Sequence, residues 1–302
     1  MNVAVTGSSG LLGGALVRQL RADGHQVVRL VRRRPVAEDE VLWYPELDTA
    51  GLAGVQAVVH LVGETMAGRW SEHQREAIRA SRVGGTRTLA EGLAGMANPP
   101  KALLSASAIG IYGDRGDEEL TERSAPGEGF LAGVHRDAER ATEVAGRAGI
   151  RVTHLRFGLV QSTEGGVLPS LLPWFRRGLG IRAGHGNQYV SWITLTDVAR
   201  AISHLLDTRG MAGPVNVVAP NPVTNREYAD TLAKVINRPR FLTLPPGMAR
   251  VVYGPGLADE VLLSSTRVLP ERLLASGFTF AQPTFEGALK NLLLAVTSDD
   301  ER

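Results

Sequence analysis

Short apolar runs alternate with stretches of helical periodicity through the first half of the chain. The apolar runs predict strands at 2–6, 26–31, 55–62, 102–107 and 151–160. Apolar positions at helical spacing predict helices at 10–23, 71–96 and 130–148. The strand runs lack polar alternation, which is typical of a sheet covered on both faces. The pattern therefore predicts an α/β fold: a doubly wound, parallel sheet of Rossmann type.

The rhythm changes after Gln161. Segments 162–186 and 237–256 are rich in Gly, Pro and Arg or have little periodicity. Around them we predict helices at 196–206, 225–236, 270–276 and 284–294, a strand at 214–218 and a frayed polar end at 297–302. We expect a Rossmann domain over 1–160 and a smaller substrate-side lobe over 161–302, with segments of 187–218 returning to the sheet.

Three glycines, Gly7, Gly10 and Gly13, connect the first predicted strand to the first predicted helix. In a dinucleotide site such glycines permit a tight turn, close approach of the backbone to a pyrophosphate, and close helix–strand packing. The helix N-terminus adds free N–H groups and its positive dipole end. The spacing is GxxGxxG rather than GxGxxG, so a glycine-rich turn without a ligand is the alternative. The predicted cofactor contacts in this loop are Gly7, Ser9, Gly10, Leu11, Leu12 and Gly13.

Three arginines, Arg32 to Arg34, follow the second predicted strand, about 20 residues past the last glycine. An NAD-selective site carries an acid here, but no acid occurs between Asp23 and Glu38. Guanidinium groups match the geometry of a 2′-phosphate. We therefore predict NADP(H) as the cofactor, with Arg32, nearest the strand end, as the main contact. A solvated basic turn is the alternative.

Composition removes several other classes of protein. Of 302 residues, 43% are hydrophobic and 21% charged, as in an ordinary globular chain. The absence of Cys excludes disulfides, thiol nucleophiles and cysteine metal sites, and the seven His show no metal-binding spacing. A net charge of +2 does not favour nucleic acid or a membrane surface. With no run of about 18 apolar residues and no basic leader, we expect a soluble cytoplasmic protein.

Several motifs together carry a family resemblance. They are VHLVGE at 59–64, SASAIGIYGDRG at 105–116, LRFG at 155–158 and SWI at 191–193. With the glycine loop, the chain resembles the extended and atypical short-chain dehydrogenase/reductase superfamily over about residues 2–294. More narrowly, it is similar to the NAD-dependent epimerase/dehydratase-like branch of epimerase-family oxidoreductases, sometimes labelled cell-division-inhibitor homologues.

The resemblance implies where the cofactor lies. The adenine side would lie near Arg32, and the strand end 61–63 would run alongside the cofactor. Arg82 matches an Asn that orders the active site, and it is alternatively placed to reach a phosphate. Outside the glycine loop, the predicted cofactor contacts are Arg32, Arg33, Leu61, Val62, Gly63, Arg82, Ser105, Ala106, His135, Phe157 and Gly158.

One part of the superfamily pattern is missing. Its general acid/base is the Tyr of a YxxxK pair, whose Lys lowers the Tyr pKa and holds the ribose. Counting back from Glu139 places Leu131 at the Tyr position and His135 at the Lys position. This departure weakens any transfer of the usual mechanism to this chain.

Three residues remain as candidate catalytic groups. Ser107 matches the active-site Ser, with a buried Ser bonded to backbone as the alternative. Tyr112 follows the same strand, although a YG turn at this place is usually structural. Glu64 ends a strand at the ligand-binding edge, where burial would make it an acid or base. Its alternative role is to bond the backbone of the glycine loop.

Two functions follow from this set of residues. The first is an NADP(H)-dependent oxidoreductase or epimerase-like protein that transfers hydride to or from a small carbonyl or alcohol substrate. The second is a catalytically silent NADP(H)-binding regulator or scaffold. We predict no nucleic-acid, membrane or metal partner, and either a monomer or a homodimer through helices 71–96 and 130–148.

Overall fold

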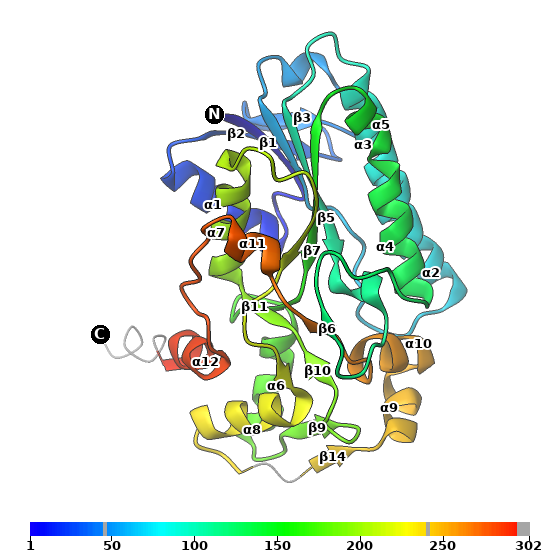
Figure 1. Ribbon diagram of the computed structural model, residues 1–302, viewed down its shortest axis with the longest axis vertical. Coiled ribbons are helices and arrows are strands. Elements are labelled where there is room, and N and C mark those ends of the chain that lie inside the picture. Colours follow the sequence, from blue (N-terminus) through cyan, green and yellow to red (C-terminus); the bar gives the residue numbers. More distant parts are fainter. Residues whose placement is uncertain (45–46, 240–241, 295–302) are drawn as a thin grey trace.

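The computed structural model describes residues 1–44, 47–239 and 242–294. Its centre is a parallel sheet of seven strands in the order β12-β7-β5-β4-β1-β2-β3 (Figure 1). The strands are β1 Asn2–Thr6, β2 Gln26–Val31, β3 Glu40–Leu42, β4 Ala57–His60, β5 Ala102–Ala108, β7 Arg151–Phe157 and β12 Gly213–Val217. The order runs outward in both directions from β1, which is the doubly wound Rossmann arrangement. The predicted fold class is confirmed.

Helices cover both faces of this sheet (Figure 1). On one side lie α1 (Leu11–Ala22), α7 (Leu195–Asp207) and α11 (Glu271–Ala275). On the other lie α2 (Glu72–Arg79), α3 (Gly85–Ala94), α4 (Phe130–Ala141) and α5 (Glu143–Arg147). Successive residues of β1 serve different layers, because strand side chains alternate: Val3 and Val5 pack with α1 and α7, and Ala4 packs with α3. This double burial explains the unbroken apolar strands.

Two predicted helices are interrupted. The helix predicted at 71–96 contains a π-helical turn, η2 (Ala80–Gly84), between α2 and α3. The helix predicted at 130–148 divides at Thr142, whose hydroxyl donates to the carbonyl of Glu139 at 2.7 Å. The strand predicted at 151–160 likewise divides at Gly158, where β7 leaves the main sheet and β8 (Leu159–Gln161) begins.

The smaller lobe is built from α6 (Val167–Arg176), α8 (Asn225–Val235) and α12 (Phe285–Leu294) around Trp192, Tyr228 and Phe285. Short strand pairs connect its segments. They are β8 with β11 (Trp192–Thr194), β10 (Tyr189–Val190) with β13 (Val223–Thr224), β9 (Ile181–Ala183) with β14 (Leu242–Leu244), and β6 (Glu119–Leu120) with β15 (Arg267–Val268). Within segment 187–218, α7 and β12 lie with the central sheet.

The sequence did not predict β3, α6 or α9 (Pro246–Tyr253). Gly166 and Pro173 suggested loop, but α6 forms because Leu168 and Phe175 are buried in the lobe. The start of α7 is capped by Thr194, whose hydroxyl accepts from the N–H of Asp197. The predicted frayed end 297–302 lies outside the described residues.

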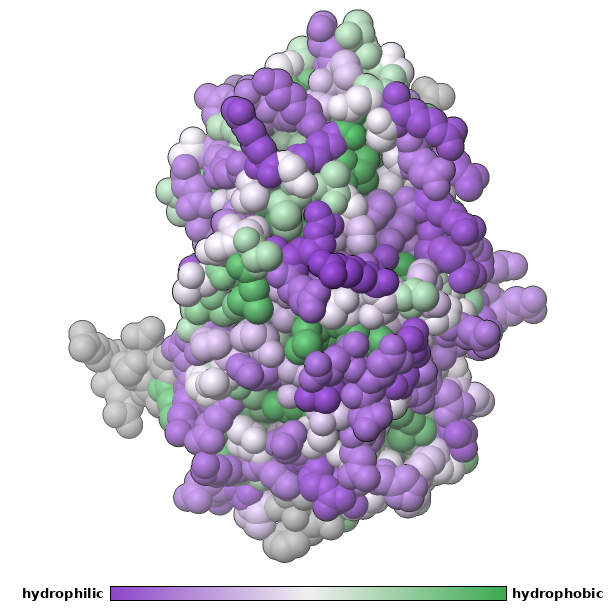
Figure 2. Space-filling view, viewed as in Figure 1, coloured by the Kyte–Doolittle hydropathy of each residue, from purple (hydrophilic) through white to green (hydrophobic). Residues whose placement is uncertain are grey.

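The surface in Figure 2 is mainly hydrophilic, with apolar residues in small groups. None of the helices in the described ranges has the length and apolar character needed to cross a bilayer.

Candidate functional site

A cleft of about 450 Å³ lies over the carboxyl ends of β1, β2 and β4, which is where open α/β sheets bind ligands. It is lined by Gly7, Ser8, Ser9, Gly10, Arg29, Leu30, Val31, Arg32, Arg33, Glu40, Trp43, Leu61, Val62 and Gly63. The structure thus brings together the glycine loop, the arginine cluster and the end of β4. These were three separate motifs in the sequence.

The glycine loop has little room for side chains. Gly7 has a φ of +67°, which favours glycine. A Cβ on Gly13 would lie 2.1 Å from the carbonyl oxygen of Gly7, so α1 packs directly on the loop that precedes it. At the start of α1, Gly10 provides no side-chain cap and the first turn has no acid. The N–H groups and the positive dipole end of α1 therefore remain available to an anion such as a pyrophosphate.

The arginine cluster contains one engaged and one free guanidinium. Arg33 donates to Glu40 at 2.8 and 2.6 Å, and Arg29 lies 3.2 Å from the same carboxylate. Hydrogen bonding from Arg33 holds the pKa of Glu40 below its usual range. Within the described chain Arg32 is exposed and has no hydrogen-bond or ion-pair partner. Glu40 was missed because β3 was not predicted, although a lone acid after three arginines is a usable signal.

Arg82 and His135 do not line the cleft, but Arg82 packs against Gly63, the last residue of its lining, and the charge of Arg82 acts on His135. A Cβ on Gly63 would lie 3.1 Å from Cζ of Arg82, so the guanidinium packs against the end of β4. Arg82 also donates from Nη1 to the carbonyl of Glu64 at 2.9 Å. The Glu64 side chain is exposed, so it lacks the burial that was expected to make it an acid or base. Its backbone N–H donates to the hydroxyl of Ser81, and its carboxylate forms no hydrogen bond with the described residues of the glycine loop.

His135 lies on α4 and is 3% exposed, against Gly110 and Leu131. Burial, together with the nearby charge of Arg82, lowers the pKa of His135 to about 4. His135 is therefore neutral at pH 7. Its Nε2 is buried and has no hydrogen-bond partner in the part of the chain that the structure describes. An unpaired polar atom at this position is the feature expected where a ligand completes the site.

The model of the NAD-dependent epimerase/dehydratase family matches residues 3–219. The chain belongs to this family. A domain of unknown function, DUF1731, matches residues 244–292. The family resemblance predicted from the motifs is thereby confirmed.

Relatives extend the match over nearly the whole chain. Epimerase family protein Mb2239 of Mycobacterium bovis is 42% identical over 293 residues, covering 95% of this chain and 96% of that protein. The structure of human epimerase family protein SDR39U1 with NADPH has a TM-score of 0.88 and 31% identity, covering 97% of this chain and 99% of that one. The nucleoside-diphosphate sugar epimerase of Corynebacterium glutamicum has a TM-score of 0.79 and 36% identity; it matches 99% of this chain, which spans 61% of that one.

In this family member, Ser107 and Tyr112 lie in a buried hydrogen-bond network. Ser107 donates to Glu139 at 2.8 Å, and Arg156 donates to both oxygens of that carboxylate at 2.8 Å. Arg156 also donates to the hydroxyl of Tyr112 at 2.9 Å, and that hydroxyl donates to Asn216 at 2.7 Å. Tyr112 is fully buried, which argues against contact with a substrate and favours a structural role.

An ionised Glu139 holds this network together. Burial raises the pKa of Glu139, but the hydrogen bonds and charge of Arg156 outweigh it and leave the pKa lowered. The Ser107 hydroxyl, 6% exposed, therefore points its proton at a carboxylate.

The remaining predicted contacts lie deeper. Leu11 and Leu12 pack against α7, Ser105 and Phe157 are buried, and Ala106 packs in the layer of α1 and α7. Gly158 is closely covered: a Cβ there would lie 2.7 Å from the carbonyl oxygen of Ser191. These residues shape the sheet edge, and none of them lines the cleft.

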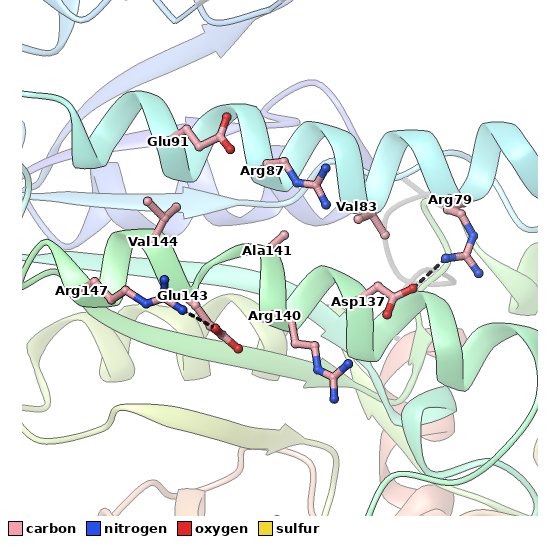
Figure 3. Close-up of a pocket in the computed structure, with 10 residues that line it drawn as sticks. All are labelled: Arg79, Val83, Arg87, Glu91, Asp137, Arg140, Ala141, Glu143, Val144 and Arg147. Atoms are coloured by element: carbon pink, nitrogen blue, oxygen red, sulfur yellow. Dashed lines mark hydrogen bonds and ion pairs between the residues drawn. The ribbon is translucent and has the colours of Figure 1, made fainter.

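A second hollow, of about 550 Å³, lies between α2–α3 and α4–α5 and shares no residue with the cleft (Figure 3). Its walls carry Arg79 paired with Asp137 at 2.6 Å, and Arg147 paired with Glu143 at 3.0 Å. Arg87 and Arg140 also line it (Figure 3). Its ion pairs are exposed and contribute little stability, typically under about 1 kcal/mol each.

Proposed function

We propose that this protein binds NADP(H) and acts as an oxidoreductase or epimerase-like enzyme on a small carbonyl or alcohol substrate. The observation that carries the proposal is the joining, in one cleft, of an uncapped α1 N-terminus and a free Arg32. The first suits a pyrophosphate and the second suits a 2′-phosphate. The NADPH in the human SDR39U1 structure gives independent support.

Each part of the cofactor would have its own contacts. The loop from Gly7 to Gly13 would hold the pyrophosphate, Arg32 the 2′-phosphate, and the strand end 61–63 would lie alongside. The neutral imidazole of His135 has a free Nε2 to exchange a hydrogen bond with a ribose hydroxyl. When bound, the nicotinamide supplies or accepts the hydride. The protein's part is to orient the reacting carbon between the sheet edge and the smaller lobe.

The catalytic residues differ from the superfamily pattern. Leu131 and His135 stand where Tyr and Lys are usual, and Ser107 is bonded to Glu139. Ser107 matches the active-site Ser of the superfamily, and Glu139, which accepts its hydrogen bond, is the group that would receive its proton. The same observations favour a second function, a regulator that binds NADP(H) without turnover.

A fluorescence titration of cofactor-stripped protein with NADPH and with NADH tests cofactor binding. We expect NADPH to bind more tightly than NADH. In Arg32→Ala the ratio of the two affinities should fall by at least about tenfold, because one charged contact with the 2′-phosphate is lost. Arg34→Ala is the matched control, since Arg34 is an exposed neighbour outside the cleft. Equal binding of both cofactors, or a preference that survives in Arg32→Ala, would contradict the selectivity.

A panel of carbonyl compounds with NADPH separates the two functions. An enzyme oxidises NADPH with some member of the panel, and Ser107→Ala lowers that rate. A regulator binds NADPH and NADP⁺ with different affinities and shows no turnover.

A further inference from the structure

Arg82 is a partly buried cation that lacks an acidic partner. Among the ion pairs of the described residues none includes Arg82, and its one protein hydrogen bond goes to the backbone carbonyl of Glu64. The other N–H groups of its guanidinium have no acceptor there. Burial lowers the pKa of Arg82, and the charge of Glu64, which forms no ion pair with it, offsets only part of this effect.

The position of Arg82 lies past the nucleotide cleft. The cleft lining reaches Gly63 and does not include Arg82, whose guanidinium packs on Gly63. The charge of Arg82 also acts on His135, which stands at the lysine position of the superfamily motif. Arg82 is therefore close to the superfamily's lysine position, and it is not among the residues that line the nucleotide cleft.

The backbone around Arg82 is also unusual. Arg82 is the central residue of the π-helical turn η2, within an otherwise α-helical run from α2 to α3. Single π-helical turns are rare and are frequent at functional sites. The regular capping of α2 by Ser71 and the helical run through α3 give no local reason for the wide turn. The turn and the unpaired charge are two independent indications at one residue.

The chemistry of the missing partner follows from these contacts. A desolvated charge is costly unless an opposite charge accepts its hydrogen bonds. A guanidinium fork binds a carboxylate through two parallel hydrogen bonds, and one positive charge balances one carboxylate. A phosphate monoester carries roughly −1.5 to −2 and is usually bound by several donors. A carboxylate is therefore the better match for a single Arg82.

We propose that Arg82 binds a carboxylate of the substrate, so that the protein acts on small oxo acids or hydroxy acids. This inference deepens the proposed function, because the carboxylate would be held beside the reacting carbon. It assigns Arg82 to substrate recognition rather than to the cofactor.

Oxamate, a small analogue of an oxo acid, is the probe, and lactamide, the amide of a small hydroxy acid, is an uncharged control of similar size without a carboxylate. Both are titrated into the protein–NADPH complex, with binding followed by NADPH fluorescence and by calorimetry. We expect oxamate to bind and lactamide not to bind. In Arg82→Gln the affinity for oxamate falls at least about tenfold, the effect of losing a charge-assisted bidentate contact. Arg82→Lys keeps the positive charge but lacks the forked guanidinium, so its affinity for oxamate should lie between those of the wild type and Arg82→Gln.

Arg87→Gln is the matched control, because Arg87 lies on α3 and lines the second hollow, which shares no residue with the cleft. It should bind oxamate as the wild type does. Urea unfolding of each variant establishes that it is folded. The proposal is overturned if the wild type does not prefer oxamate to lactamide, or if Arg82→Gln retains the oxamate affinity. It is equally overturned if that variant loses NADPH affinity while its oxamate affinity is unchanged.

Failure of the proposed function gives a different result. If the wild type binds no NADPH, calorimetry with oxamate alone still measures the affinity of Arg82 for a carboxylate.

Discussion

The carboxylate of Glu260 accepts a hydrogen bond of 2.7 Å from the backbone N–H of Leu131, 129 residues away in sequence. It also accepts one of 3.0 Å from Phe130, so it caps the start of α4 at the position where the superfamily carries its tyrosine. Glu260 belongs to residues 246–262, here called the strap, which contain α9, α10 (Pro255–Leu257) and η4 (Ala258–Leu262) (Figure 1). The strap thus connects the C-terminal half to the start of α4.

Removal of this cap should release the strap. The strap has further contacts, since Arg69 donates to the carbonyl of Val251 and Trp70 packs near Gly256. We expect Glu260→Ala to lower the free energy of unfolding by about 0.5–2 kcal/mol and to speed proteolysis within 246–262. Urea unfolding and limited trypsin digestion measure the two effects.

Asp259→Ala is the control for this prediction. Asp259 lies beside Glu260 but pairs with Arg250 in an exposed ion pair, worth less than about 1 kcal/mol. If both variants are digested equally fast, the Glu260 cap does not hold the strap.

Gly13 and Gly14 are neighbours in α1, but only Gly14 has space around it for a side chain. A Cβ on Gly13 would lie 2.1 Å from the backbone oxygen of Gly7, whereas a Cβ on Gly14 would lie 3.8 Å from the end of the Arg18 side chain and 3.9 Å from the carbonyl oxygen of Ser8, both ordinary contacts. We expect Gly13→Ala to destabilise the fold by about 2 kcal/mol or more and to weaken NADPH binding. Gly14→Ala should stabilise it by about 0.5–1 kcal/mol, because alanine is the better helix former.

Thermal unfolding and NADPH titration of the two alanine variants test this contrast. Tolerance of Gly13→Ala with unchanged NADPH affinity would be inconsistent with a close-packed loop that approaches the cofactor.

Two buried histidines should make stability depend on pH. Burial lowers the pKa values of His60 and His135 from 6.5 to about 4. Below pH 6.5 the unfolded chain takes up protons that the folded chain does not, so the stability present above pH 6.5 is lost as pH falls towards 4. At about one and a half pH units below the ordinary pKa, the loss in the free energy of unfolding is about 2 kcal/mol per histidine.

Urea unfolding at pH 7 and pH 5 measures this loss. We expect the difference between the two pH values to shrink by about 2 kcal/mol in His60→Gln and in His135→Gln. His73 lies exposed on α2, so His73→Gln should leave the difference unchanged. If His60→Gln and His135→Gln lose as much stability between pH 7 and pH 5 as the wild type does, groups other than these two histidines cause the loss.

The sequence allowed close prediction of strands that consist of a short apolar run. β1 and β2 were predicted at the residues where they occur, because Asn2–Thr6 and Gln26–Val31 are apolar runs bounded by turn residues. Elements stabilised by distant contacts were missed. α6 contains Pro173 and depends on burial of Leu168 and Phe175 among residues of α8 and α12. No local pattern reports such packing.

The candidate site divides in the same way. The glycine loop and Arg32 were predicted because their chemistry depends on residue type and spacing along one strand–turn–helix unit. The partners of the other groups come from distant segments. Arg33 is bound by Glu40 on β3, and Ser107 by Glu139 on α4. Tyr112 is enclosed by Arg156 and Asn216, and these surroundings favour a structural role for a residue that the sequence offered as catalytic.

The sequence by itself determined the doubly wound sheet, the family and the positions of the nucleotide-binding motifs, since these depend on periodicity and on short spacings. Only the tertiary structure decided which charged side chains are free. Arg33 and Arg82 are both arginines near a predicted cofactor, yet Arg33 is paired with a carboxylate, and Arg82 forms no ion pair with any residue that the structure describes. The physical reason is that the availability of a charge depends on its neighbours in space, and sequence spacing does not give those neighbours.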